Sequence, residues 1–489
     1  MDVFDLTRKA ATGVAGLDDI LGGGLSTGRV FLLEGHPGTG KTTIALRFLI
    51  EGALLGERGL YVTLSETDSE LRVGAASHGW TLDPNIRVFE VVPPELLDAN
   101  QQQSLLYSSD LELGETTKMI LEEVERYKPS RLVLDSLSEI RLLSQSSLRY
   151  RRQILAMKHF FSRHGATVLM LDDLTTDVLD KTVHSVAHGV IRLEEFTPKY
   201  GTSRRRVRVV KYRGQPFRGG YHDLTIRTGG VEVYPRLVAS EHHSGFERTR
   251  HTTGIKELDA LLGGGIDQGS STLVIGPSGT GKSVFTLQFV SAAMRRGEKA
   301  AMFIFDEELG LLFERAKGLG FDLAAWRDSG QLIIQQLDAA ELSPGEFAYR
   351  VREQVDRAQA KTVVIDSMNG YQAAMPDESA LALHIHELVQ YLNRQGATTF
   401  LTVAQAGVVG DIRAPVDLTY LADTAVLLRY FEAKGTVRRA ISVIKKRTGP
   451  HEETIREFHI GRNGLTLGAP LVNFQGVLAG VPEFVVSAG

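Results

Sequence analysis

Two glycine-rich loops of one pattern, each ending in Lys and a hydroxyl residue, carry the clearest chemical signal in this chain. They cover residues 35–42 (GHPGTGKT) and residues 276–283 (GPSGTGKS). Each loop follows an apolar, strand-like run and precedes a helix-like one, which is the context of a phosphate-binding loop. The predicted ATP-binding residues are Gly35, Gly38, Thr39, Gly40, Lys41 and Thr42 in the first copy and Gly276, Ser278, Gly279, Thr280, Gly281, Lys282 and Ser283 in the second.

These residue types explain how such a loop would hold a nucleotide. Glycine lets backbone N–H groups close around phosphate oxygens, and the N-terminus of the following helix adds positive potential. Lys41 and Lys282 would reach the outer phosphates, and the hydroxyl groups of Thr42 and Ser283 would bind Mg²⁺. We therefore expect two sites for ATP, with Mg²⁺ as the second cofactor.

A second metal-binding group in each copy is the Asp that ends an apolar strand. Residues 132–134 (LVL) lead into Asp135, and residues 363–365 (VVI) lead into Asp366. Such runs suit a central parallel strand that is buried on both faces, and an acid at its carboxyl end lies beside the phosphate loop. We predict that Asp135 and Asp366 complete the Mg²⁺ sites with Thr42 and Ser283.

Between these two motifs, each copy has another strand-like run that ends in acid. Glu66 follows the first run and Glu307 follows the second, at equal distances from their phosphate loops. A carboxylate next to the γ-phosphate can orient and deprotonate an attacking water or hydroxyl. We predict this catalytic role for Glu66 and Glu307; the alternative is an acidic turn exposed to solvent.

A basic pair on a strand recurs later in each copy. Lys211 and Arg213 form the first pair, and Lys445 and Arg447 form the second. Residues two apart share one face of a strand, so each pair presents two cations together. We predict that they contact the γ-phosphate bound by a neighbouring subunit, with a charged strand edge as the alternative.

The elements that must position these residues are duplicated as well. Thr12-Gly13, Leu17-Asp18 and residues 22–24 (GGG) recur before the second loop at the same spacing as the loops themselves. Strand, loop, helix and strand in repeated order predict two α/β domains, residues 1–240 and 250–489, each with a mostly parallel sheet flanked by helices. The polar stretch 239–248 is predicted to be the linker between them.

Composition limits the classes of protein to which this chain can belong. The 489 residues are 43% hydrophobic and 23% charged, with a formal net charge of −4 and no cysteine. Disulfides and cysteine-bound zinc are thereby excluded, and no apolar run approaches the ~18 residues of a membrane span. With no signal-peptide pattern at the N-terminus, we expect a cytoplasmic protein that does not bind membranes. The acidic balance gives no support to DNA as a partner.

Taken together, these motifs resemble those of the KaiC family, double-domain ATPases within the RecA-like superfamily. The resemblance covers both loops, both Asp-Ser strand ends, both Lys-x-Arg pairs, the Gly-Gly-Gly stretches and residues 449–458. It implies two tandem RecA-like P-loop domains, a two-tiered homohexamer with ATP at the subunit interfaces, and a role as a signalling or circadian clock-type ATPase. It also implies serine/threonine autokinase activity in the second tier.

The resemblance assigns further residues by position. The family's adjacent catalytic glutamates fall on Ser65 and Glu66 in the first domain and on Asp306 and Glu307 in the second. Ser65 cannot act as a base, so hydrolysis in the first tier would depend on Glu66, and the second site is the more intact one. The family's two phosphoacceptors fall on Thr419 and Tyr420, of which Thr419 has the expected hydroxyl type.

Partners follow from the same resemblance. The chain itself is the first partner, and a KaiB-like protein is compatible with the sequence. Only residues 485–489 follow Phe484, so we do not expect the tail that a KaiA-type activator grasps. Two other functions stay open at this point: a RecA-like recombinase or helicase acting on DNA, and a nucleotide-gated assembly scaffold with slow hydrolysis.

Overall fold

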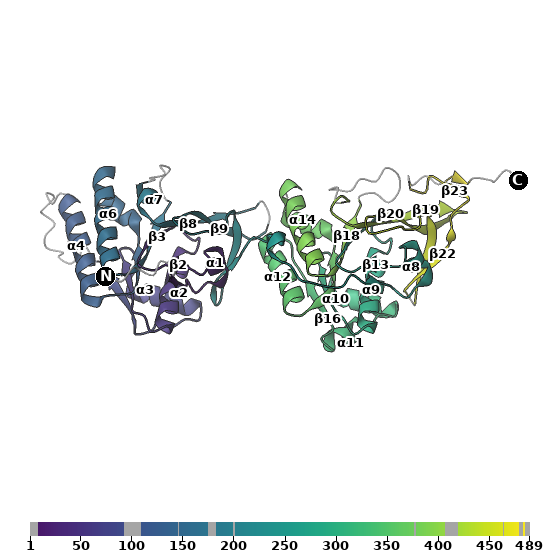
Figure 1. The fold of residues 1–489 in the computed structure, drawn as a ribbon, viewed down its shortest axis with the longest axis horizontal. Helices are drawn as coiled ribbons and strands as arrows, with labels where there is room; N and C mark the ends of the chain where they lie inside the picture. The colour runs from purple at the N-terminus through teal and green to yellow at the C-terminus, as the bar shows by residue number, and fades with distance from the viewer. Residues whose placement is uncertain are drawn as a thin grey trace. The chain divides into compact units, whose positions relative to one another are not determined.

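The computed structural model describes residues 8–91, 109–144, 146–174, 182–198, 201–375, 378–405, 419–462, 464–478 and 483–484. The chain divides into two compact units, Met1–Arg236 and Leu237–Gly489, here named the first and the second unit. Each unit is built around one nine-stranded sheet (Figure 1).

The two sheets have the same strand order. From one edge to the other, the first sheet runs β5 (Ile86–Glu90), β4 (Gly59–Thr63), β6 (Arg131–Asp135), β7 (Thr167–Asp173), β3 (Val30–Gly35), β8 (Gly189–Phe196), β9 (Arg204–Tyr212), β10 (His222–Arg227) and β11 (Gly230–Tyr234). The second runs β16 (Leu332–Gln336), β15 (Lys299–Ile304), β17 (Ala360–Asp366), β18 (Thr398–Ala404), β14 (Ser271–Gly276), β19 (Thr424–Ala433), β20 (Thr436–Lys446), β21 (Arg456–Gly461) and β22 (Gly464–Pro470).

Strand direction follows the hydrophobic pattern of the sequence. The strands from β5 to β8, and from β16 to β19, pair in parallel, and the last three strands of each sheet are antiparallel. The central strands β3 and β14 are buried along their whole length, as parallel strands covered on both faces must be. This architecture confirms the predicted fold class of two tandem RecA-like α/β domains.

Helices cover both faces of each sheet. Those of the first unit are α1 (Ala15–Ile20), α2 (Lys41–Leu54), α3 (Asp68–Ser77), α4 (Ser109–Tyr127), α5 (Leu137–Leu142), α6 (Ser147–Arg163) and α7 (Thr182–Val186). Those of the second are η2 (Ala239–Glu241), α8 (Lys256–Leu261), α9 (Lys282–Arg295), α10 (Leu309–Gly318), α11 (Leu323–Asp328), α12 (Pro344–Asp356), α13 (Met368–Ala374) and α14 (Glu378–Arg394). The described residues also form three two-stranded pairs: β1 (Lys9–Ala10) with β2 (Leu25–Ser26), β12 (Arg250–His251) with β13 (Ile266–Asp267), and β23 (Phe474–Gln475) with β24 (Glu483–Phe484).

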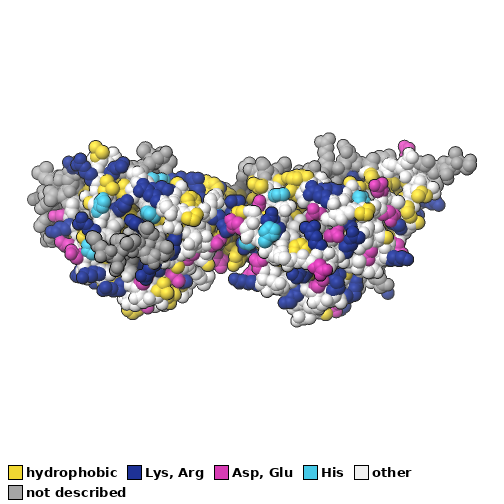
Figure 2. All heavy atoms as spheres, viewed as in Figure 1, with side chains coloured by type: hydrophobic (Ala, Val, Ile, Leu, Met, Phe, Trp, Pro, Cys, Tyr) yellow, Lys and Arg dark blue, Asp and Glu magenta, His cyan; other side chains and the backbone are white. Residues whose placement is uncertain are grey.

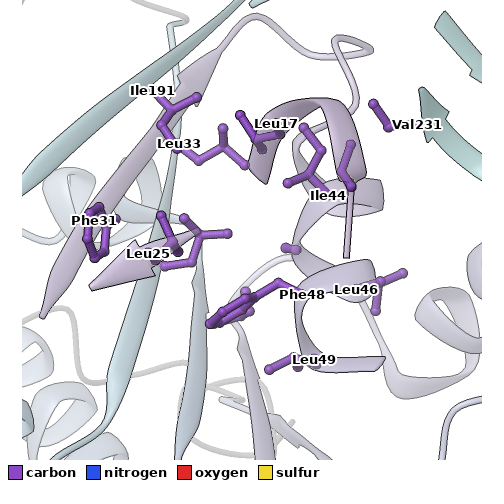
Figure 3. Packing of buried hydrophobic residues seen from close by; sticks show 14 of the residues in the cluster. Leu17, Leu25, Phe31, Leu33, Ile44, Leu46, Phe48, Leu49, Ile191 and Val231 are labelled. Carbon is purple, nitrogen blue, oxygen red and sulfur yellow. The ribbon is translucent and has the colours of Figure 1, made fainter. Parts of the chain in front are cut away.

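The core of the first unit fixes the helix that carries Lys41. Alternate residues of β3 point to opposite faces, and Phe31 and Leu33 share one hydrophobic cluster with Ile44, Phe48 and Leu49 of α2. Figure 3 shows the α2 side chains Ile44 and Phe48 turned toward the sheet side of this cluster. The first turn of α2 is thereby held at the carboxyl end of β3.

The stretch predicted as a linker packs on the second unit. Leu237 and Ala239 are buried in a core cluster of that unit, and the backbone N–H of Ala239 donates to Glu387 Oε2 at 2.8 Å. Further along, Ser244 Oγ donates to the carbonyl of Arg394 at 3.1 Å. The division between the units therefore lies between Arg236 and Leu237, before the polar residues that the sequence pattern singled out.

The surface carries both signs of charge. On the face shown in Figure 2, Lys and Arg side chains lie among Asp and Glu side chains on each unit. None of the helices within the described ranges combines the length and hydrophobicity that a membrane crossing needs.

Candidate nucleotide sites

Each phosphate loop connects a central strand to a helix, through a glycine that no other residue could replace without strain. Gly40 and Gly281 cap α2 and α9 with φ of 99° and 109°, in the left-handed region. A Cβ at Gly40 would lie 2.8 Å from Ile226 Cδ1, and one at Gly281 would lie 2.7 Å from Ile460 Cδ1. The backbone angle therefore requires glycine here, and a Cβ would in addition have to displace an isoleucine methyl group of β10 or β21.

The two loop lysines fold over their own loops. Lys41 Nζ donates to the carbonyls of Gly35 at 2.7 Å and His36 at 3.0 Å. Lys282 Nζ donates to the carbonyls of Gly276 and Pro277, both at 2.9 Å. Burial lowers the pKa of Lys282, with Asp366 acting in the opposite direction. Each ammonium group thus lies inside the curve of its loop.

A cavity of about 590 Å³ opens at the loop of the second unit. This volume lies within the range of small-molecule sites. The cavity is lined by the phosphate loop, by the carboxyl ends of β15 and β17 and by α10. Its lining includes Ser278, Gly279, Gly281, Lys282, Ser283, Asp306, Glu307, Arg315, Asp366 and Ser367. The structure therefore brings the predicted metal and catalytic residues of this unit together with five of its predicted loop residues, whereas Gly276 and Thr280 do not line the cavity.

The Asp that ends β17 is held from two sides. Ser283 Oγ donates to Asp366 Oδ2 at 2.6 Å, and Thr402 Oγ1 of β18 donates to Asp366 Oδ1 at 2.5 Å. The predicted pair of metal ligands, Ser283 and Asp366, is thus already in contact. Oxygen ligands of this kind are those that Mg²⁺ takes from proteins.

The first unit holds its equivalent Asp in another way. Tyr61 OH, on β4, donates to Asp135 Oδ2 at 2.5 Å. Burial raises the pKa of Asp135, and the bonds from Tyr61 and Thr42 and the charge of Lys41 oppose that shift in part. Thr42 and Asp135, the predicted metal ligands of this unit, are therefore neighbours as well.

The two predicted catalytic glutamates differ in their partners. Partial burial raises the pKa of Glu66, and the charges of Asp135, Glu70 and Asp173 add to the shift. Glu307 lies 2.6 Å from Arg315 Nη2 of α10, and burial raises its pKa against the effect of that arginine. Asp306 accepts a hydrogen bond from Ser367 Oγ.

The four cations predicted to contact a neighbour's phosphate bind backbone carbonyls in this structure. Lys211 and Arg213 donate to His184 and Ser185, respectively. Lys445 donates to Thr419 at 2.8 Å and to Ala422 at 2.7 Å, and Arg447 donates to Tyr420 at 2.7 Å. Among described residues, none of this group lines the second-unit cavity. The predicted phosphoacceptors and the second basic pair thus form one cluster, separate from the cavity of their own unit.

Sequence reasoning missed several polar residues that the strand order brings to these sites. They are Tyr61 and Asp173 in the first unit and Thr402 and Arg315 in the second. Asp172 and Asp173 together end the apolar run of β7, so the pattern that identified Asp135 also marks this pair. Tyr61, Thr402 and Arg315 carry no comparable signal, because their roles depend on which strands become neighbours. Residues 485–489, on which the prediction about an activator rests, lie outside the described residues.

Comparison with known proteins agrees with this geometry. A family model described as "ATPase: KaiC" matches residues 10–238 and again residues 251–471. The chain is 28% identical over 492 residues to the circadian clock protein KaiC3 of Synechocystis sp., covering 99% of this chain and 96% of that protein. It is 28% identical over 488 residues to the circadian clock oscillator protein KaiC of Thermostichus vulcanus, covering 97% and 92%. The KaiC of Prochlorococcus marinus (strain MIT 9313) is 28% identical over 491 residues, covering 97% and 96%.

Proposed function

Because the chain belongs to the KaiC family of ATPases, we propose that both units bind ATP with Mg²⁺ and hydrolyse it, and that the second unit also phosphorylates the chain on Thr419. The assembly would be a homohexamer with ATP at the subunit interfaces. The observation that carries the proposal is the second-unit cavity, where Lys282, Glu307 and Asp366 converge.

The residues of this cavity suit the parts of phosphoryl transfer. Lys282 would hold the outer phosphates, and Ser283 and Asp366 would hold Mg²⁺, which neutralises charge on the phosphate oxygens. Glu307 lines the same cavity and would take the proton of the attacking group. Its pKa, raised by burial, favours acceptance of that proton. The first unit would use Lys41, Thr42, Asp135 and Glu66 in the same roles.

Phosphorylation would use the hydroxyl of Thr419 in place of water. A bond forms between Thr419 Oγ1 and the γ-phosphorus as the bond to the β,γ-bridging oxygen breaks. ADP leaves with that electron pair, and the hydroxyl proton passes to the Glu307 carboxylate of the neighbouring subunit. Thr419 and Tyr420 are both exposed, with Tyr420 54% exposed, so either side chain is accessible to another subunit. Thr419 is the better acceptor because its hydroxyl lies close to the backbone.

Lys445 and Arg447 support a transfer between subunits. Their side chains bind the backbone of residues 419–422 and therefore travel with Thr419. An interface that brings Thr419 to a neighbour's γ-phosphate would bring two cations with it. Charge on the phosphate oxygens would then be neutralised from both subunits, as phosphoryl transfer demands.

The test is to incubate the purified chain with Mg-ATP and to map incorporated phosphate by peptide mass spectrometry. We expect phosphate on Thr419 and its loss in Glu307→Gln, because that change removes the base and lowers transfer by ~10²- to 10⁴-fold. Tyr420→Phe should keep the signal. Phosphate on Tyr420 alone would overturn the assignment to Thr419, and absence of phosphate from both would remove the kinase proposal while leaving ATP hydrolysis.

Mixing two variants tests the subunit arrangement. The Glu307→Gln chain, labelled with heavy isotopes, lacks the base but keeps the acceptor, whereas Thr419→Val keeps the base and lacks the acceptor. Phosphate on heavy Thr419 only in the mixture would support transfer between subunits. The unmixed Glu307→Gln chain is the matched control.

A further inference from the structure

Asp173 occupies a place in the first unit where the fold concentrates phosphate chemistry. It is the last residue of β7, which lies between the loop strand β3 and the strand β6 that ends in Asp135. All three strands are parallel, and Asp173 pairs with Gly35, the first residue of the phosphate loop. Its side chain therefore emerges at the sheet edge between the loop and the predicted metal ligand.

The contacts of Asp173 direct it into the site. Its Oδ1 atom lies 2.7 Å from Nζ of Lys41, whose side chain is only 7% exposed. Its Oδ2 atom accepts a hydrogen bond from Ser138 Oγ at 3.3 Å, and Ser138 Oγ lies 2.8 Å from Ser136 Oγ. The charge of Asp173 also contributes to raising the pKa of Glu66. This carboxylate thus lies beside the lysine that would hold the outer phosphates.

The second unit has a different arrangement of the same number of acids. The partner of Gly276 on β18, equivalent to Asp173, is Ala404, and the residue equivalent to Ser65 is Asp306. Each site therefore has an Asp at the end of β6 or β17, here called the Walker B Asp, a Glu after the neighbouring strand, and one further carboxylate. That further carboxylate is Asp306 in the second unit and Asp173 in the first.

A serine contact links the two arrangements. Ser367, next to Asp366, donates directly to Asp306. Ser136, next to Asp135, contacts Ser138, which donates to Asp173. The serine after the Walker B Asp is therefore connected to the further carboxylate in both units, although the two carboxylates come from different strands.

We propose that Asp173 is a catalytic carboxylate of the first site and replaces the one that Ser65 lacks. The inference rests on the proposed ATPase function of that site. When ATP binds, the ammonium group of Lys41 would contact the phosphates instead of Asp173. Asp173 and Glu66 would then both be able to accept a hydrogen bond from the attacking water. The water oxygen bonds to the γ-phosphorus as the bond to the β,γ-bridging oxygen breaks. ADP leaves with the electron pair, and the water proton passes to a carboxylate and then to solvent.

The experiment isolates the first site. In a chain carrying Asp306→Asn and Glu307→Gln, phosphate release reports turnover at the first site, and retention of labelled ATP on a filter reports binding. Adding Asp173→Asn should lower kcat by about 10²-fold without raising KM, since it removes a group that acts on the attacking water. Adding Ser65→Glu to that variant should recover at least tenfold, because it returns a carboxylate to the site.

Two further variants keep the result interpretable. Glu70→Gln is the matched control, because Glu70 also raises the pKa of Glu66 but serves as the N3 residue of a capping box that Gln can maintain, so turnover should stay within about twofold. Asp173→Ala is the second variant, because the second unit has an alanine, Ala404, at the equivalent position. It replaces Asp173→Asn if that variant fails to fold.

The outcomes separate this inference from the function on which it rests. If Glu66→Gln stops turnover but Asp173→Asn leaves it unchanged or accelerates it, the proposal is overturned and Asp173 only holds Lys41. If the parent variant binds ATP but shows no turnover, the proposed function of the first site fails and the role of Asp173 fails with it. A fall with Asp173→Asn that Ser65→Glu reverses supports the proposal.

Discussion

The two nucleotide sites share a backbone frame but hold their Walker B aspartates with different side chains. Tyr61 donates to Asp135 from β4, on one side of its strand, whereas Thr402 donates to Asp366 from β18, on the other side. Met302 occupies the strand position of Tyr61, and Leu171 occupies that of Thr402. The shared strand order thus keeps the carboxylate in place, although the residue that donates to it lies on a different neighbouring strand in each unit.

The surroundings of the central strand differ even more. In the first unit Glu34 Oε1 lies 2.6 Å from Arg192 Nη2, and Glu34 Oε2 lies 2.7 Å from His184 Nε2. Burial raises the pKa of Asp172 to about 6, although the charge of Arg141 and its hydrogen bond oppose that shift. Ile275, Leu427 and Val403 stand at the positions of Glu34, Arg192 and Asp172 in the second unit. Buried charges must be paired, whereas apolar residues need only fit. The first sheet therefore depends on a polar network that the second dispenses with.

The largest expected effect tests whether the two cores are independent. Phe48 on α2 and Phe289 on α9 are equivalent buried rings; Phe48 packs under Arg131 at 4.7 Å, and Phe289 packs on Phe400 at 4.6 Å. Truncating either ring to Ala should lower the free energy of unfolding of its own unit by ~3 to 5 kcal/mol.

Each unit can report on its own unfolding, because the chain has two tryptophans, Trp80 in the first unit and Trp326 in the second. Urea unfolding would be followed by fluorescence in Trp326→Phe and Trp80→Phe backgrounds. Leu54→Ala is the control, since Leu54 on α2 is 71% exposed. Destabilisation of both units by one substitution would contradict independent cores.

The next largest effect is expected when the second site is given the residues that stand at equivalent positions in the first site. Asp306→Ser gives the second site the residue of the first and should lower its turnover by about 10²-fold, through loss of a carboxylate. Adding Ala404→Asp supplies the acid at the β18 position and should recover most of the loss. Phosphate release in a Glu66→Gln background isolates the second site. Equal activity of the single and double variants would show that the two carboxylates are not interchangeable.

A smaller effect is expected from removing the two different Asp-holding donors. Tyr61→Phe removes the bond to Asp135 in a buried setting and should destabilise the first unit by ~1 to 3 kcal/mol. Thr402→Val should lower the free energy of unfolding of the second unit by less, about 1 kcal/mol, because Ser283 still donates to Asp366. Urea unfolding followed by fluorescence in the Trp326→Phe background measures the change in the first unit, and the same measurement in the Trp80→Phe background measures the change in the second. A larger loss with Thr402→Val would reverse the assignment of Tyr61 as the more important donor.

The sequence was sufficient for those features that depend on local order. A strand, a glycine turn and a helix start are enough to place Lys41 and Lys282 at the first turn of a helix, without reference to the rest of the fold. An apolar run that ends in acid is enough to place Asp135 and Asp366 at the carboxyl ends of strands. The duplicated motifs also predicted two α/β domains, which the two matching sheets confirm.

Contacts that depend on strand neighbours were beyond such reasoning. The bond from Tyr61 to Asp135 exists because β4 pairs with β6, and the ion pair of Lys41 with Asp173 exists because β7 lies beside β3. The basic pairs show the same limit. Spacing predicted that Lys445 and Arg447 share one strand face, but β20 ends at Lys446, and spacing gave no sign that the two side chains bind the carbonyls of Thr419 and Tyr420. Register and strand order are properties of the assembled sheet, so a linear pattern does not contain them.

The smallest expected effect is a loss of stability at low pH. It distinguishes the antiparallel end of the first sheet from that of the second. His222 of β10 is buried, its Nδ1 accepts from the Arg236 N–H at 2.8 Å, and its Nε2 lies 3.0 Å from the Arg218 carbonyl. Burial lowers the pKa of His222 to about 4; the charges of Arg236 and Arg218 add to that shift, whereas the Arg218 carbonyl and the charge of Asp19 oppose it. Arg456 occupies the equivalent position in β21, where the second unit therefore has no histidine.

A histidine whose pKa is lower in the folded state stabilises the fold above its unfolded pKa, near 6.5, and this contribution is lost as pH falls toward 4. At pH 5.5 the first unit should therefore lose about 1 kcal/mol through His222 relative to pH 7.5. Urea midpoints in the Trp326→Phe background measure the loss, and His222→Gln, which can keep both hydrogen bonds without titrating, should reduce it. An equal pH dependence with and without His222 would show that protonation of other groups sets the acid sensitivity of the first unit.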